Sequence, residues 1–272
     1  MQENHNELTR TIEPETKPET EPETVKMSPG KRIISLFVAP GELMSNIKAR
    51  PVFLVPFLLA VVIGLVTVVP NVRVTEMYER ELSNISIERY GRDFFDMSAL
   101  ANEYGEIPMA EAMTAITWLS HIAMAFILPL IACLLYAVGL FILSKILRGK
   151  AKFGQLFSMC MHIYAIFAVG ALVVASLMSL TGSLLDMTTL AAVFARNGTF
   201  DQLSYNIFSG IGIFPIWSSV LAFIGVKVLG EFCNVKAGII AGVYFLAGLT
   251  VHIVSYMSIW WMYDVLIGAG LM

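Results

Sequence analysis

Long apolar runs separated by short polar loops dominate this chain. Five such runs occur, and they cover about 51–70, 116–143, 156–185, 207–229 and 237–263. Each is long enough for the ~20 helical residues that cross the hydrocarbon of a bilayer. A helix is expected for each run because backbone groups in lipid must hydrogen-bond within their own segment. The pattern therefore predicts an all-α fold, a bundle of five transmembrane helices.

Two stretches of different character precede this five-span membrane domain, which we place at 51–270. Residues 1–30 repeat Pro-Glu-Thr and contain no aromatic residue, a composition typical of a disordered acidic tail. Residues 31–50 join an apolar stripe to basic groups and are interrupted at Pro40. This pattern predicts an amphipathic segment in the cytoplasmic membrane interface, and a plain helical lead-in to the first span is the alternative. Its candidate contacts for anionic lipid headgroups are Lys31, Arg32, Lys48 and Arg50.

The charges of the loops differ between the two sides of the predicted bundle. Ten basic residues lie in 31–50, 144–155 and 227–236, against five in the alternate loops. Short loops rich in Lys and Arg remain in the cytoplasm. Five spans then place the N-terminus in the cytoplasm and the C-terminus outside. In the outer loop 71–112, apolar residues and opposite charges four apart predict a helix lying against the bundle.

Composition supports the membrane assignment and argues against catalysis. The chain is 57% hydrophobic and 14% charged, unlike ordinary soluble domains. Its three cysteines have spacings that fit neither a zinc site nor a disulfide framework, and no HExxH motif occurs. We therefore expect a protein that is not an enzyme, with no catalytic residue, metal, cofactor or nucleic-acid partner.

Polar side chains within the apolar runs are the candidates for a site, because such groups are costly in lipid and often functional. His121 is expected near the outer face and His162 near the inner face, which separates them by much of the membrane depth. His252, Tyr256 and Ser255 belong to the densest polar cluster. That cluster forms either hydrogen bonds between helices or a small polar site for a substrate.

Small residues and prolines predict how the helices meet and bend. Gly238 and Gly242 form a GxxxG pattern, which permits close helix approach within the bundle or between protomers. Pro129 and Pro215 lie inside the second and fourth runs and predict kinks there. Ser218 lies one turn beyond Pro215. Transporters use the backbone carbonyl groups that such a kink frees, and ordinary helical bundles also tolerate these free groups.

Three stretches, taken in order, resemble the Yip domain family, named for Ypt/Rab-interacting proteins. They are LFVAP at 36–40 running on to IKARP at 47–51, GKAKFGQL at 149–156, and FPIW at 214–217 leading on to Lys236. The resemblance covers about 36–260 and implies a non-enzymatic integral membrane protein that acts through partner proteins. In eukaryotic relatives these partners are Rab GTPases of vesicle traffic. The Asp-Leu-Trp-Gly-Pro stretch of eukaryotic members is absent, which favours a prokaryotic member.

The sequence thus predicts an integral membrane scaffold or adaptor of a prokaryotic plasma membrane. Its expected partners are membrane lipids and membrane or cytoplasmic proteins active in membrane organisation or trafficking-like processes. A Rab-like GTPase is expected only if the chain is eukaryotic. The alternative is a small-molecule or lipid transporter, or a lipid-handling protein, that uses the cluster around His252 and Tyr256. A polar cavity reaching the bilayer midplane favours that alternative, and a packed interior favours the scaffold.

Overall fold

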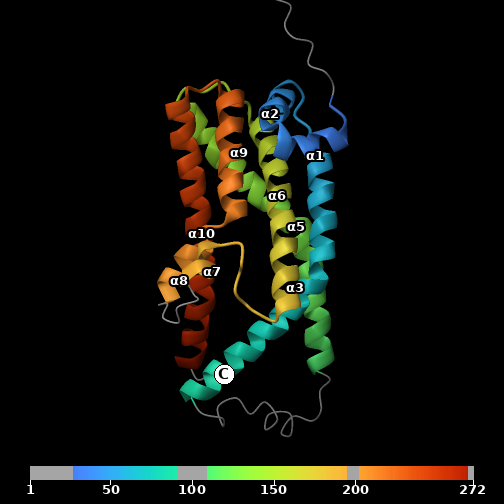
Figure 1. Cartoon of the computed structure of the whole chain (residues 1–272), viewed down its shortest axis with the longest axis vertical. Helices are drawn as coiled ribbons and strands as arrows, with labels where there is room; N and C mark the ends of the chain where they lie inside the picture. Colours follow the sequence, from blue (N-terminus) through green and yellow to red (C-terminus); the bar gives the residue numbers. More distant parts are fainter. Residues whose placement is uncertain (1–26, 91–108, 195–201, 269–272) are drawn as a thin grey trace, which may run out of the picture.

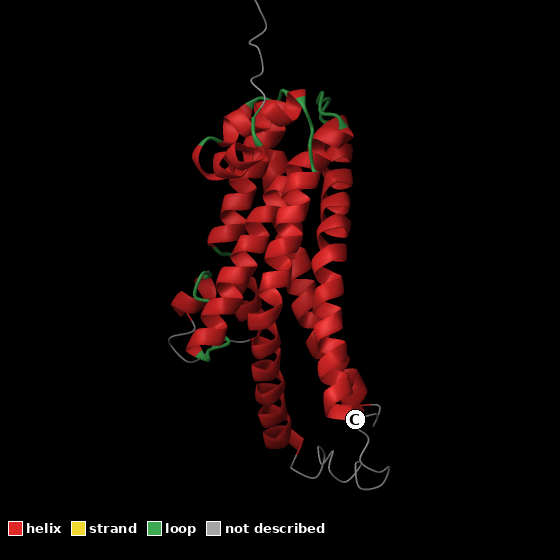
Figure 2. Ribbon diagram, turned by 90° about the vertical axis from the view of Figure 1, so that its right-hand side faces the viewer, coloured by secondary structure: helices red, strands yellow, loops and turns green. Residues whose placement is uncertain are grey.

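The computed structural model describes residues 27–90, 109–194 and 202–268. These residues form a helical bundle, and none of them lies in a β-strand beyond one isolated bridge between Thr189 and Gly212 (Figures 1 and 2). The helices are α1 (Pro29–Val38), α2 (Pro40–Ala49), α3 (Leu54–Tyr90), α5 (Met109–Ile146), α6 (Phe153–Thr181), α7 (Leu190–Phe194), α8 (Gln202–Ser209), α9 (Ile213–Gly230) and α10 (Asn234–Gly268).

Five of these helices are long and apolar enough to cross a membrane. The candidate spans are Leu54–Tyr78, Trp118–Ile146, Phe153–Thr181, Ile213–Gly230 and Asn234–Ser255. The all-α fold with five spans predicted from the apolar runs is therefore confirmed. The fourth run differs in detail, because α8 ends at Ser209 and α9 begins only at Ile213.

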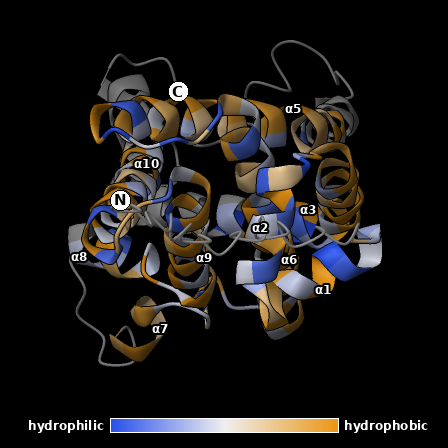
Figure 3. Cartoon of the chain, turned by 90° about the horizontal axis from the view of Figure 1, so that it is seen from above, coloured by the Kyte–Doolittle hydropathy of each residue, from blue (hydrophilic) through white to orange (hydrophobic). Residues whose placement is uncertain are grey.

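Helices α1 and α2 cover one end of the bundle (Figures 1 and 3). The side chain of Ser28 caps α1. Pro40 lies in the first turn of α2, where the backbone N–H that proline lacks would have no partner within the helix. The last residues of the predicted tail 1–30 thus belong to α1, and residues 1–26 lie outside the described part. We call the end that carries α1 and α2 the capped end, and the opposite end the far end.

The apolar face of α2 is buried against α6 and α9. Leu43, Met44 and Ile47 are fully buried. An interfacial helix would turn this face toward lipid, whereas here it faces the bundle. A stripe of this kind is buried against whichever apolar surface is adjacent, and sequence alone does not identify that surface.

Close packing is concentrated in the half of the bundle next to the capped end. The buried side chains come from the last part of α5, the first part of α6, the second half of α9 and the first part of α10; they include Leu140, Leu156, Met159, Ile163, Leu221, Leu229 and Ile240. The hydrophobic core of the described bundle therefore lies in this half.

The third helix is much longer than the first apolar run. It passes Pro70 and continues to Tyr90, and its last part crosses below the far end of the bundle (Figure 1). The helix predicted in 71–112 is therefore present as a continuation of α3, and residues 91–108 lie outside the described part. Pro129 lies inside α5, which continues through it.

Candidate functional site

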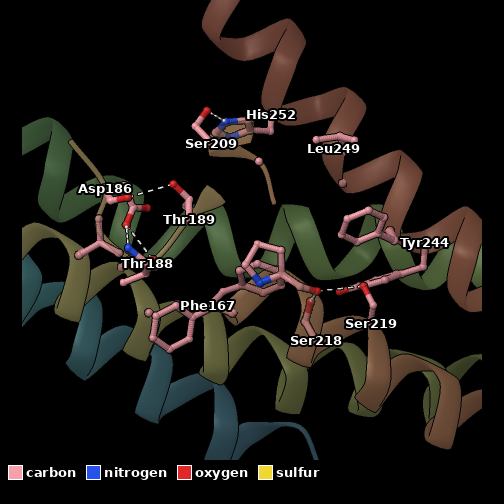
Figure 4. Close-up of a pocket in the computed structure, with 18 of the residues that line it drawn as sticks. Phe167, Asp186, Thr188, Thr189, Ser209, Ser218, Ser219, Tyr244, Leu249 and His252 are labelled. Carbon is pink, nitrogen blue, oxygen red and sulfur yellow. Dashed lines mark hydrogen bonds between the residues drawn. The ribbon is translucent and has the colours of Figure 1, made fainter. Parts of the chain in front are cut away.

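A cavity of about 400 Å³ lies in the far half of the bundle (Figure 4). It is lined by Tyr136 of α5, by α6 and the loop that follows it, by the end of α8, by the first half of α9, and by α10. Most of its wall is apolar, from Phe167, Val174, Phe214, Phe245 and Leu249. Its polar lining includes Asp186, Thr188, Ser209, Ser218, Tyr244 and His252.

The depth of the cavity follows from the rise of α10. Tyr244 and His252 lie ten and eighteen residues after Asn234, at about 15 and 27 Å along the helix axis. The hydrocarbon core of a bilayer is ~30 Å thick. Measured along α10, the cavity therefore occupies the part of the span farther from the capped end, next to the packed core.

A well-fixed loop forms the outer wall of the cavity. Gly182 ends α6 with φ of 67°, a left-handed conformation that glycine adopts without steric cost. Asp186 Oδ1 then accepts hydrogen bonds from the backbone N–H and the hydroxyl of Thr188, at 2.8 and 2.7 Å. Further on, the Ile213 N–H donates to the Thr188 carbonyl at 3.1 Å. The loop is thereby attached to the start of α9.

Pro215 lies in the first turn of α9, and so it does not kink a continuous helix as the sequence suggested. At this position its missing N–H is not needed by the helix. Its carbonyl accepts from the hydroxyls of Ser218 at 2.7 Å and Ser219 at 2.9 Å. The Tyr244 side chain hydrogen-bonds that of Ser218. A chain of polar groups thus joins α9 to α10 at the inner end of the cavity.

His252 and Ser209 join α10 to α8 at the outer end of the cavity. His252 Nε2 lies 2.9 Å from Ser209 Oγ, which also lies 3.0 Å from the Asn206 carbonyl. Since Ser209 has a single hydroxyl proton, donating it to that carbonyl leaves the Ser209 oxygen to accept from a protonated Nε2. Gly210 makes this approach feasible, because an added Cβ would lie 2.5 Å from Leu249.

The other polar residues singled out in the sequence lie elsewhere. His121 lines a separate cavity of about 330 Å³ between α3, α5 and α6. His162 is buried in the capped half, where its Nδ1 lies 2.7 Å from the Ser158 carbonyl. Ser255 is exposed and outside the cavity wall, and the Tyr256 side chain lies outside the described part. Of the members of that set whose side chains are described, the cavity brings together His252 and Ser218.

Sequence reasoning missed Asp186, Thr188, Ser209 and Tyr244 as members of one site. Asp186 stood out only as a loop charge. A usable signal was the run Ser209-Gly210-Ile211-Gly212 ahead of Pro215, which marks a helix end and a new helix start inside an apolar run.

At the capped end, two lysines from distant segments bind one carboxylate. Lys48 Nζ lies 2.8 Å from Glu231 Oε1, and Lys150 Nζ lies 2.7 Å from Oε2. These hydrogen bonds, first from Lys150 and then from Lys48, lower the pKa of the Glu231 carboxyl from 4.5 to about 2. The three residues join α2, the turn after α5 and the turn after α9.

Backbone contacts strengthen the same attachment. Gln155 Nε2 donates to the Lys48 carbonyl at 2.7 Å, and the Ser158 hydroxyl donates to the Val52 carbonyl at 2.8 Å. The two bonds fix the last turn of α2 and the segment that follows it to the first turns of α6. The cap is therefore part of the folded bundle.

The four basic residues proposed as headgroup contacts have different environments. Lys48 is in the ion pair with Glu231, and only 6% of Arg32 is exposed. Lys31 and Arg50 are exposed. Only these last two are free of both burial and an ion pair, so a headgroup contact remains a prediction for them alone.

The GxxxG pattern does not serve close packing within the described part of the chain. A Cβ added at Gly238 or Gly242 would meet nothing within 4 Å. A contact between protomers at these glycines remains a prediction.

Comparison with known proteins identifies the family. The Yip1 domain model matches residues 34–256 of the chain. The match begins in α1 and ends in α10, and it includes all five candidate spans. No curated protein and no solved structure matches. The match covers well over half of the chain, and this integral membrane protein belongs to the Yip1 domain family.

Proposed function

We propose that this protein is a non-enzymatic membrane scaffold or adaptor that binds partner proteins at the capped end, on the cytoplasmic side of a prokaryotic plasma membrane. The orientation is supported by charge, because every lysine of the described part lies at the capped end, whereas the part of α3 toward the far end carries only Arg73, Arg80 and Arg89. The basic residues at the capped end include Lys31, Arg50, Lys145, Arg148, Lys150, Lys152, Lys227 and Lys236. Loops of this composition remain in the cytoplasm. The C-terminus is then outside. The prokaryotic source is supported by the absent Asp-Leu-Trp-Gly-Pro stretch.

The observation that carries the adaptor role is an exposed apolar row on a rigid support. Ile34, Phe37 and Val38 on α1 have half or more of their surface exposed. They project from a cap that the Lys48–Glu231–Lys150 ion pairs and the buried face of α2 fasten to the bundle. A preformed apolar surface binds a partner without the entropic cost of ordering it. Large apolar side chains of this kind are the usual anchors of protein interfaces.

Photo-crosslinking in cells tests this role. A benzophenone amino acid placed at Phe37 is expected to give discrete adducts with one or a few proteins. The control is Leu180, an apolar position at the far end of α6 that is even more exposed than Phe37, where no such adduct is expected. Adducts with lipid alone at Phe37 would show that α1 lies in the membrane interface, and the adaptor proposal would then fail.

A second candidate, the handling of a lipid or small amphiphile, is favoured by the cavity in the far half. The cavity has a polar outer end and an apolar wall, and it stops at the packed core. Those features suit binding within one leaflet better than passage across the membrane. Native mass spectrometry of protein released from nanodiscs tests it: a retained lipid-sized mass supports the role. Protein free of any such mass, under conditions that preserve other membrane protein–lipid complexes, would count against it.

A further inference from the structure

One pair of tyrosines separates the far-half cavity from a second, wholly apolar space. Tyr136 of α5 and Tyr244 of α10 line the cavity and also a groove of about 560 Å³ between the same two helices. Their ring centroids are 5.0 Å apart, at an interplanar angle of 51°. The two rings thus form a wall that the cavity and the groove share.

The groove is open to the side of the bundle where lipid lies. Leu135 of α5 and Val251 of α10 line it and are largely exposed. Helix α10 packs mainly against α9 and much more sparsely against α5, which leaves the groove between α5 and α10 unfilled. Since the helices cross a bilayer, acyl chains are the molecules that cover such a surface.

The outer end of the cavity has the opposite character. Among the lining residues that the structure describes, Asp186 is the one carboxylate, and none is Lys or Arg. Both hydrogen bonds that Asp186 makes with Thr188 use Oδ1, so Oδ2 can accept from a further donor. In Figure 4, Asp186 and His252 lie at the same end of the cavity, above Phe167 and Ser218. A carboxylate here attracts donors and cations and repels anions.

We propose that the cavity binds a single-chain membrane amphiphile whose head donates hydrogen bonds and carries no negative charge. The head lies at Asp186 and the His252–Ser209 pair. The chain runs past Leu249 to the tyrosine pair and continues into the groove between α5 and α10. This inference rests on the lipid-handling function proposed second above, and it adds the class of head, the position of the chain and the route of entry.

The shape of the space excludes other classes of ligand. His252 and Tyr244 are eight residues apart on α10, so the polar outer end and the tyrosine pair are separated by about 12 Å. The wall between them is formed by apolar side chains such as Phe245 and Leu249. A compact polar solute would leave this wall unfilled. An anionic head would be placed against Asp186, with no Lys or Arg among the described lining residues to neutralise it.

Photolabelling of the full chain in nanodiscs of neutral zwitterionic lipid tests the proposal. Three probes of equal chain length carry the same diazirine and differ only in the head, which is an amine, an alcohol or a carboxylate. We expect the amine and the alcohol to label residues of α9 and α10 that line the cavity. The carboxylate is expected to label them about tenfold less, because it meets Asp186 unpaired.

Two variants and one control locate the site. Gly248→Leu fills the cavity from α10, where an added Cβ just contacts the Tyr136 hydroxyl at 3.4 Å, and is expected to reduce labelling by the amine and the alcohol about tenfold. Gly242→Leu adds the same side chain to the same helix at an open position and is expected to label as the wild type does. Asp186→Asn keeps the Oδ1 acceptor for Thr188 but removes the charge. It is expected to lower amine labelling about fivefold and alcohol labelling by less, because an alcohol oxygen can accept from the new amide N–H whereas an ammonium group cannot.

The possible failures are distinct. If no probe labels the cavity, both the inference and the lipid-handling function are wrong. If all three heads label it equally and Gly248→Leu abolishes this labelling, lipid binding stands and the head selectivity is wrong. If Gly248→Leu folds, as shown by its elution and melting temperature, and labels as Gly242→Leu does, the site is not in this cavity. The adaptor role at the capped end is untouched by each outcome.

Discussion

Replacing Ile47 by Ala tests whether α2 belongs to the folded bundle or lies in the membrane interface. Ile47 is 0% exposed and is part of the core cluster formed with α6 and α9. The substitution removes three carbons, each worth ~0.8 kcal/mol of burial, or about 2.4 kcal/mol together. The space left behind adds to this cost, so a loss of about 3 kcal/mol is expected, within the usual range for Ile→Ala in a core.

The assay is the melting temperature of the purified protein in mild detergent, followed by size-exclusion chromatography after heating. For a domain of this size, 1 kcal/mol corresponds to about 2–4 °C, so Ile47→Ala is expected to melt about 6–12 °C lower. The matched control is Val38→Ala on α1, whose side chain is 77% exposed. That change is expected to cost less than about 0.5 kcal/mol, since exposed substitutions rarely cost more.

Equal melting temperatures for the two variants would refute the reasoning. Such a result would mean that α2 rests in detergent or lipid, where a smaller side chain leaves no cavity. The attachment of the cap, and with it the support for the adaptor role, would then be lost.

Three further predictions concern the capped end. Cys233 is exposed, and a hydrogen bond from the Lys236 N–H lowers the pKa of its thiol. An impermeant maleimide should therefore label Cys233 rapidly in inside-out vesicles and not in intact cells. Labelling in intact cells would show that the proposed orientation is reversed. Because the Glu231 carboxyl has its pKa lowered to about 2, its ion pairs stabilise the fold above pH 4.5, and this contribution is lost as the pH falls toward 2. The melting temperature of Glu231→Gln should therefore fall less over that interval than that of the wild type; parallel curves would show that the exposed pairs contribute nothing measurable. Deleting residues 2–26 should leave the melting temperature unchanged, since α1 begins only after its Ser28 cap, and a clear drop would show that the tail contacts the fold.

The same capped end shows where prediction from sequence stops. The apolar stripe of α2 was recognisable, yet lipid and protein offer equally apolar surfaces, and only the packing of α6 and α9 decides between them. Lys48 was an unpaired cation in the sequence, and its partner Glu231 lies 183 residues away along the chain. Pairing over such a distance depends on how the helices are arranged, which no local pattern records.

The cavity illustrates the same limit at the far end. His252 and Ser218 were singled out because polar groups in apolar runs are conspicuous. Asp186 looked like an ordinary loop residue, and Ser209 was not singled out although it lies in the fourth apolar run. They join the site because a bridge between Thr189 and Gly212 folds the loop onto α9, and because α8 ends one turn before α9 begins. Pro215 was interpreted as a kink within one span, because residues 210–212, which separate α8 from α9, are uncharged and do not end the apolar run in the sequence.

The sequence by itself determined the five spans, the all-α class, the charge difference between the two ends and the resemblance to the Yip family. These properties follow from composition within each segment, because a backbone in lipid must satisfy its own hydrogen bonds and needs ~20 apolar residues to do so. Only the tertiary structure decided which face of α2 is buried, which cations are paired and where a cavity remains. Those outcomes depend on contacts between helices far apart in the chain, and in a bundle made of similar apolar surfaces many such arrangements share one hydropathy pattern.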